Sequence, residues 1–415
     1  MKKSILSILV LLITGSAISQ EISYGEYMER VMSGNISLTA KKLDIEIADA
    51  GVKSSKVHND PTLGVTYTNS EDWDKKLGQG IEVELSRSFT FGVRRGRIEV
   101  AESERRHTIA MLEDYMRNFR ADATIAYLGQ LRAQMMHAEA QEIYKELSAV
   151  AQGDSIRFKR GEIAEGDWLE SRMAQGIARN AMLETEALCS NTAIVMGYYT
   201  GNLENAQSLR GTGSLEMSEE AAPVENYIMT ALANRPDIVA ALSRAETAEA
   251  TQRFNRAQRR PELDVKIGAT YNKARPDFTI LMAGVAIPLK FSNLNKGAKI
   301  LDEVMVKQSN IAIEEARLLV EADVMQAYNN FRYASMQAET FTGKTLDDMR
   351  TVVEGKRKAY ELGEISFMEY LIAERNESEM RREYIEALYN KAVAWVELQR
   401  ATGFSLEFGT TPVAE

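Results

Sequence analysis

The sequence contains two copies of one pattern, and this internal duplication limits the possible folds more than any other feature. At an offset of about 200 residues, the same residue types recur in the same order. The matches lie near the start, in the middle and at the end of each half, which chance does not explain. The matched pairs include Tyr27 with Tyr227, Ala48 with Ala248, Pro61 with Pro261, Leu63 with Leu263, Gly161 with Gly363, and Thr200 with Thr402.

The duplication divides the chain of 415 residues into two predicted repeats. The first repeat covers 20–204 and the second covers 224–404. A Gly- and Ser-rich stretch at 205–223 is predicted to be the linker between them, because such residues favour turns and loops. The last residues, 405–415, are predicted to form a C-terminal tail.

Residues 1–19 have the pattern of a signal peptide. Two lysines precede a run of about nine apolar residues, and Ala17 and Ser19 stand at the small-residue positions that a signal peptidase reads. The run is shorter than the roughly 20 residues of a membrane-spanning helix. We therefore expect a mature start near Gln20, outside the cytoplasm. Because no later stretch is apolar over that length, any membrane insertion would have to use strands.

The composition argues against several classes of function. The chain has 60 Asp and Glu against 50 Lys and Arg, a net charge of −10, whereas a nucleic-acid partner would need a concentrated basic face. One cysteine and three histidines leave few ligands, so we expect no metal site and no cofactor. Neighbouring carboxylates such as Asp347 and Asp348 diverge around a helix, so we also expect no enzyme active site.

Each repeat is predicted to contain a helix, two strands, a long helix and a further helix. The helices follow from alanines and leucines at three- and four-residue spacing, and the strands from alternation of apolar and polar residues. The two shorter helices together nearly equal the long one, so they would pack end to end along it as a helical wall. The expected ranges are helices at about 27–58, 94–152 and 167–199, with strands near 63–68, 81–86, 263–271 and 279–289.

The predicted strands have one apolar and one polar face. Strands of about nine to eleven residues can cross a bilayer when tilted, and the polar face suits a water-filled lumen. Four strands cannot close a barrel alone; a soluble sheet packed on helices is the alternative. We expect lipid contacts from Ile81, Val83, Leu85, Val265 and Ile267, and lumen-facing side chains from Glu82, Glu84, Asp264 and Lys266.

The order of these elements and their duplication resemble the TolC-like outer-membrane efflux protein family. The segments that carry the resemblance are 234–238 (Asn-Arg-Pro-Asp-Ile), 260–263 (Arg-Pro-Glu-Leu), 287–289 (Ile-Pro-Leu) and 360–366 (Tyr-Glu-Leu-Gly-Glu-Ile-Ser). Residues 60–63 and 89–95 are similar to the heavy-metal, Czc-type branch. Ser86 departs from the family pattern, because the second repeat has Pro288 at the corresponding corner.

The resemblance implies an α+β membrane protein with an internal duplication. Three copies would each give four strands to a twelve-stranded β-barrel in the cell outer membrane, and their helices would form an antiparallel coiled-coil tunnel in the periplasm. Loops 69–80 and 272–278 would lie outside the cell. The implied function is passive: an exit duct for small molecules or metal ions, working with a periplasmic adaptor and an inner-membrane pump. The alternatives are a type I protein-secretion channel and a periplasmic coiled-coil structural protein without a pore.

The resemblance also implies two kinds of site. The turns Arg160-Gly161-Glu162 and Leu362-Gly363-Glu364 would be the tips that meet the adaptor or pump; the glycines suit a left-handed helix exit. Tyr360, Asp167 and Glu369 would form the periplasmic gate, with Asp167 and Glu369 about two helical turns from the tip. We expect Tyr360 to hydrogen-bond Asp167, since Ile365 stands where the family has a latch arginine.

Overall fold

The computed structural model describes residues 20–69, 79–217, 221–273, 279–289, 296–341 and 343–403. The predicted signal peptide, the C-terminal tail and most of the loops 69–80 and 272–278 lie outside these ranges. The described chain falls into two compact units, and each draws on both repeats. Unit 1 combines residues up to 39 with 117–231 and 323–415, and unit 2 combines 40–116 with 232–322.

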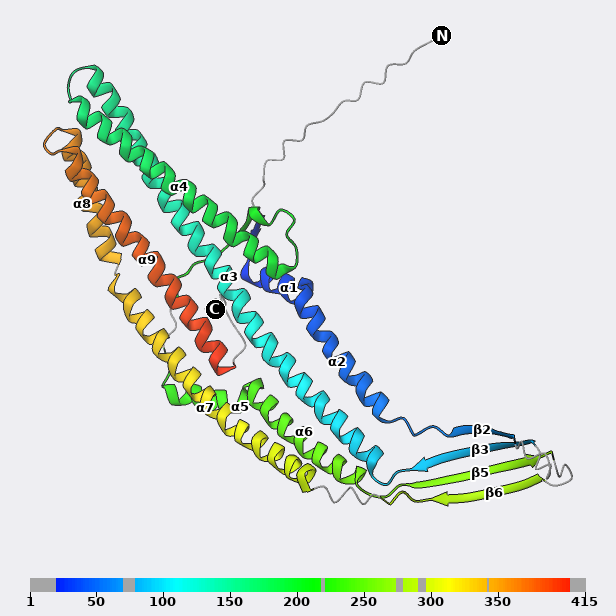
Figure 1. The fold of residues 1–415 in the computed structure, drawn as a ribbon. Helices are drawn as coiled ribbons and strands as arrows, with labels where there is room; N and C mark the ends of the chain where they lie inside the picture. The colour runs from blue at the N-terminus through cyan, green and yellow to red at the C-terminus, as the bar shows by residue number, and fades with distance from the viewer. Residues whose placement is uncertain are drawn as a thin grey trace, which may run out of the picture. The chain divides into compact units, whose positions relative to one another are not determined.

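Unit 1 contains mainly helices. Helix α3 (Val93–Lys159) contributes its second part, followed by α4 (Glu165–Thr200). From the second repeat come the end of α7 (Lys296–Thr340), α8 (Gly343–Glu361) and α9 (Phe367–Thr402). Figure 1 shows α8 and α9 as a hairpin, and the two helices pack against each other. Two short helices, α1 (Tyr24–Gly34) and α5 (Val224–Asn234), complete the helices of this unit.

The first predicted helix, 27–58, is interrupted at Asn35. The Asn35 Oδ1 accepts a hydrogen bond from the Leu38 amide at 3.0 Å, so its side chain caps the start of α2 (Ile36–Ser55). Its Nδ2 donates to the Tyr199 carbonyl at 3.0 Å, near the end of α4. The second repeat has the same break at Arg235, before Pro236, which occupies the first turn of α6 (Pro236–Gln258).

The long helix differs between the repeats. In the first repeat it is a single helix of 67 residues, α3, which is longer than predicted. In the second repeat α7 ends at Thr340 and α8 begins at Gly343. The Phe341 amide still donates to the Ala338 carbonyl at 3.2 Å, while its ring lies 6.0 Å from that of Tyr384 on α9. Phe341 therefore contacts α9 at the break between α7 and α8.

The predicted linker is partly ordered. Its residues Ala206–Ser208 form a turn of 3₁₀ helix, and β4 (Leu209–Gly211) pairs in parallel with β1 (Gln20–Ile22). Side chains of α3 hold this pair: the Tyr127 hydroxyl donates to the Thr212 carbonyl at 2.6 Å. Gln134 exchanges two hydrogen bonds with the Gly211 backbone, at 2.9 and 3.0 Å. Part of the predicted linker therefore has secondary structure of its own.

Unit 2 contains the sheet. Its strands are β2 (Thr62–Asn69), β3 (Gln79–Phe89), β5 (Leu263–Asn272) and β6 (Thr279–Ala286), antiparallel in the order β2-β3-β5-β6 (Figure 1). The four predicted strands are confirmed. The last was expected to reach 289 but stops at Ala286, because Pro288 has no backbone N–H to donate to a sheet.

Candidate functional site

The two predicted tip turns have the same backbone structure. Gly161 and Gly363 have φ angles of +73° and +78°. In each turn the glycine amide and the following amide donate back to the preceding helix, at 2.9–3.0 Å, which is the Schellman pattern of a helix end. A Cβ atom at either glycine would meet nothing within 4 Å, so the left-handed backbone alone explains the residue type. The predicted helix exits are confirmed.

The turns expose their side chains to solvent. Leu362 is 75% exposed, which is high for a large apolar residue, and Glu364 beside it is also exposed. In the first turn Arg160 and Glu162 are exposed and form an ion pair at 3.9 Å. Such a pair contributes little to stability at a surface. The tips therefore carry charge and one large apolar side chain that the subunit leaves uncovered.

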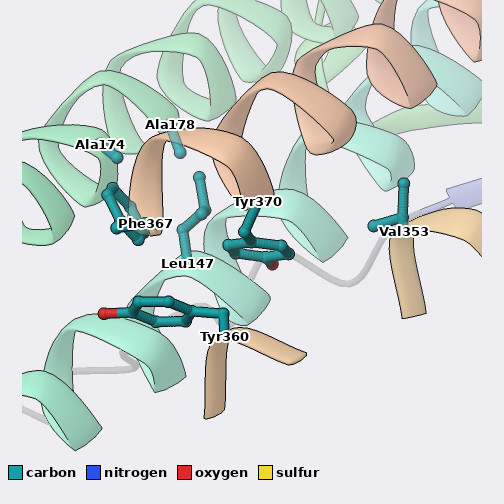
Figure 2. Close-up of a cluster of buried hydrophobic side chains, with 7 residues drawn as sticks. All are labelled: Leu147, Ala174, Ala178, Val353, Tyr360, Phe367 and Tyr370. Atoms are coloured by element: carbon teal, nitrogen blue, oxygen red, sulfur yellow. The ribbon is translucent and has the colours of Figure 1, made fainter. Parts of the chain in front are cut away.

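Behind the second turn lies a buried cluster of apolar and aromatic side chains (Figure 2). The Tyr360 ring stacks on that of Tyr370 at 6.1 Å and meets Phe367 edge-on at 5.5 Å. Because these residues come from α3, α4, α8 and α9, the cluster joins both helical hairpins behind the turns. Its members are Leu147, Ala174, Ala178, Val353, Tyr360, Phe367 and Tyr370.

The hydroxyl of Tyr360 bonds to Asp154, so the predicted bond to Asp167 is wrong. It donates to Asp154 Oδ2 at 2.8 Å, and the Asp154 side chain is only 3% exposed. Arg157, one turn further along α3, lies 3.6 Å from the other Asp154 oxygen and 5.5 Å from the Tyr360 ring centroid. We call Tyr360, Asp154 and Arg157 the latch triad; it ties α8 to α3.

The charges of the latch triad complement one another. Burial and the hydrogen bond to Asp154 raise the pKa of Tyr360, so its hydroxyl keeps the proton that it donates. Arg157 supplies a guanidinium to the same carboxylate, a role that Ile365 cannot take; Ile365 instead packs against the apolar cluster. One feature of the sequence could have indicated that Asp154 is buried. It follows Leu147 and Ala151, which are buried, at the four- and three-residue spacing that places all three on one face of α3.

Asp167 and Glu369 lie nearer the turns than predicted. Both occupy the third position of their helices, α4 and α9, because the turns themselves use the residues between glycine and helix start. The Glu369 amide donates to the Ser366 hydroxyl at 3.3 Å, and its carboxylate pairs with Lys356 at 3.7 Å. The Glu369 side chain is 56% exposed and Asp167 is half-buried, so both acids remain accessible.

The sheet has the predicted alternation of side chains. Val83 stands opposite Val65 and Ala269, and Leu85 opposite Leu63 and Ile267, so these side chains share one face. Many of them are strongly exposed although they are apolar. The exposed fractions on this face include Leu63 66%, Val65 66%, Tyr67 59%, Ile81 47%, Val83 41%, Leu85 42%, Ile267 55%, Leu281 82% and Val285 63%.

The opposite face of the sheet is polar over β3 and β5. Glu84 forms an ion pair with Lys266 at 3.0 Å, and the Ser88 hydroxyl donates to Asp264. Glu82 lies in register with Thr66 and Thr270. On β6 this face becomes apolar, with Ile280 and Met282 in register with Thr270 and Gly268.

The described residues contain no group of three or more His, Cys, Asp or Glu side chains placed to hold a metal ion. Within the same ranges, none of the helices has both the length and the apolar character needed to span a membrane.

Comparison with known proteins gives a consistent result. The sequence profile of the family described as outer membrane efflux protein matches residues 227–404, which is almost the whole second repeat. This match agrees with the resemblance of the sequence to TolC-like outer-membrane efflux proteins. The chain is 23% identical over 374 residues to CzcC of Cupriavidus metallidurans, a cobalt-zinc-cadmium resistance protein, and the match covers 89% of this chain and 86% of CzcC.

Two solved structures of transmembrane or outer-membrane channels share the fold of this chain. CmeC of Campylobacter jejuni superposes with a TM-score of 0.77 at 14% identity, covering 91% of this chain and 85% of CmeC. CusC superposes with a TM-score of 0.73 at 16% identity and covers 91% of both chains. The likeness spans both repeats, whereas the sequence profile reaches only the second.

Proposed function

We propose that the chain is one of three identical subunits of a passive exit duct in the outer membrane. A periplasmic adaptor and an inner-membrane pump would deliver the cargo. The observation that carries the proposal is the sheet of unit 2, which exposes a continuous apolar face and ends in two outer strands, β2 and β6. The match of residues 227–404 to the outer membrane efflux protein family supports the same proposal.

The edges of the sheet explain why more than one copy is needed. An unpaired strand edge is costly in lipid, because no water satisfies its N–H and C=O groups. Pairing of β2 in one subunit with β6 in the next would remove these edges, and three copies of a four-stranded sheet give twelve strands. The apolar face would then meet lipid, and Glu82, Glu84, Asp264 and Lys266 would line the lumen.

The proposed cargo is small molecules or metal ions. The similarity to CzcC, a cobalt-zinc-cadmium resistance protein, favours metal ions. The proposal needs no metal site in this chain, since a wide duct can pass its cargo without binding it. A type I secretion channel would use the same subunit with a different pump.

Membrane fractionation tests the proposal most directly. A duct should be recovered in the outer-membrane fraction and run on gels as a trimer that dissociates on heating. Purified protein should conduct ions in planar bilayers. Recovery as a soluble periplasmic protein would contradict the proposal and favour a coiled-coil structural protein without a pore.

The tips are proposed to dock the adaptor or pump, and replacement of their glycines tests this. Gly363→Val should abolish export while trimers still reach the outer membrane, because valine strongly disfavours the positive φ and distorts only the turn. Gly161→Val should act in the same way. Gly355→Ala is the matched control, since Gly355 lies inside α8 with open space around it. Normal export by both valine variants would place the docking surface elsewhere.

Glu369 is proposed to line the aperture, where threefold symmetry would bring three carboxylates together. Glu369→Ala should reduce cation selectivity in planar bilayers and weaken block by multivalent cations. Lys356→Gln should have the opposite effect, because it removes the cation that pairs with Glu369. Unchanged selectivity in both variants would remove Glu369 from the conduction path.

A further inference from the structure

A buried carboxylate on α9 has no role in the turns or the latch triad. Glu374 is 5% exposed, and its Oε2 has no hydrogen-bond partner among the described residues. The Tyr370 hydroxyl, one turn earlier on the same helix, is also buried and without such a partner. A buried charge without partners is costly, so this position calls for a physical explanation.

Glu374 faces a cavity of about 190 Å³ whose lining is rich in charged groups from three helices. From α4, the residues near Glu374 are apolar or neutral: Ala174, Ile177, Ala178, Ala181 and Thr185. The charged and titratable groups around it are Glu139, Glu142 and Glu146 from α3, Arg350, Glu354 and Arg357 from α8, and Tyr370, Arg375, Glu377, Glu379, Arg381 and Arg382 from α9 itself.

Arg381, the arginine whose charge acts on Glu374, already forms ion pairs with other acids. Arg381 pairs with Glu139 at 3.3 Å and with Glu377 at 2.7 Å. On α8, Arg350 pairs with Glu354 at 3.3 Å. The carboxylates of Glu139, Glu146 and Glu377 act on Glu374 as well, so an ionised Glu374 would add a further negative charge at a buried position.

Burial, together with Glu146, Glu377 and Glu139, raises the pKa of Glu374 from its ordinary value of 4.5 to about 7. Arg381 opposes this rise and does not cancel it. The side chain is thus divided between its neutral and ionised forms near neutral pH.

We propose that proton exchange at Glu374 controls how tightly α9 packs against α3 and α8, and through this packing how readily the gate opens. The link to the gate is short, because Tyr370 lies one turn from Glu374 on α9. The Tyr370 ring stacks on that of Tyr360 (Figure 2), and Tyr360 is a member of the latch triad. The consequence for the gate rests on the proposed function; the proton dependence of the packing does not.

The direction in which pH changes the packing of α9 follows from the two protonation states of Glu374. Below pH 4.5 the carboxyl is neutral in both the packed and the unpacked state, and burial carries no charge penalty. Between pH 4.5 and 7 the unpacked state loses its proton first, so the packing weakens as pH rises. Above pH 7 the loss is complete and the packing changes no further. Acidic conditions therefore favour the closed helix packing.

Hydrogen exchange on the full chain in detergent micelles tests the proposal between pH 5 and 9. After correction for the intrinsic exchange rate, amides at 367–378 should exchange faster as pH rises, and the change should be complete near pH 7. Glu374→Gln should remove this dependence and keep exchange slow throughout, because glutamine stays neutral. Glu383→Gln is the control, since Glu383 is an exposed acid nine residues further along α9 and its loss should preserve the wild-type profile.

A second variant tests the same charge balance without touching Glu374. Glu146→Gln removes one repelling carboxylate and should move the transition to lower pH. Conductance of the same preparations in planar bilayers separates the two proposals. A conducting protein with flat exchange would overturn the role of Glu374. A protein that does not conduct but shows the pH-dependent exchange would overturn the proposed duct and leave the proton dependence standing.

Discussion

Replacing Val83 by lysine should prevent stable insertion of the sheet into the outer membrane. Val83 lies in the middle of β3 on the apolar face, opposite Val65 and Ala269. A lysine on a lipid-facing strand position costs about 2–4 kcal/mol at the bilayer midplane. We therefore expect heat-dissociable trimers to disappear from the outer-membrane fraction. Quantitative gels of fractionated cells measure this loss.

The neighbouring residue provides the matched comparison. Glu82 precedes Val83 on β3 and therefore points to the opposite, polar face. Glu82→Lys should insert normally and lower the preference of the pore for cations, because it reverses one lumen charge per subunit. Normal insertion of Val83→Lys together with failure of Glu82→Lys would mean that the two faces are assigned backwards.

The second large effect is expected at the latch triad. Tyr360→Phe removes the hydroxyl that donates to Asp154 and leaves a buried carboxylate with one fewer partner. A hydrogen bond to a charged group contributes roughly 1.5–3 kcal/mol, which corresponds to about a 10- to 100-fold shift between closed and open states. Single-channel recordings without adaptor should therefore show a higher open probability.

Alanine variants test whether Asp154 or Asp167 is the partner of Tyr360 that keeps the gate closed. Asp154→Ala should raise the open probability as Tyr360→Phe does, while Asp167→Ala should remain close to wild type. Tyr384→Phe is a suitable control, because the Tyr384 hydroxyl makes only an exposed contact of 3.4 Å with Glu216. A strong effect of Asp167→Ala with none from Asp154→Ala would restore Asp167 as the partner of Tyr360.

Much of the fold could be predicted because it follows from local patterns. Period-two alternation located all four strands of the sheet, and the glycines at 161 and 363 marked the two turns that their positive φ angles require. The duplication supported these assignments, because the same strands and turns recur in both repeats. The break at Arg235 could also have been recognised, because Pro236 favours the first turn of a helix.

The remaining features depend on tertiary contacts that local patterns do not contain. Asn35 ends α1 partly because its side chain bonds to the end of α4, far away in sequence. The partner of Tyr360 was missed because family resemblance pointed to Asp167, while Asp154 looked like one more acid in a long helix. Glu374 looked equally ordinary; only the packing of α9 against its neighbours shows that it is buried.

The pairing of β1 with β4 has a consequence for the order of folding. Gln20 lies opposite Leu209, so the strand pair joins the two ends of the first repeat across nearly its whole length. Contacts so distant in sequence form late, since the loop between them must first become ordered. We expect residues 20–22 to stay accessible to proteases until residues 209–211 have been added to the chain. The first repeat would then close around Tyr127 and Gln134, making residues 20–22 the last part of that repeat to become fixed.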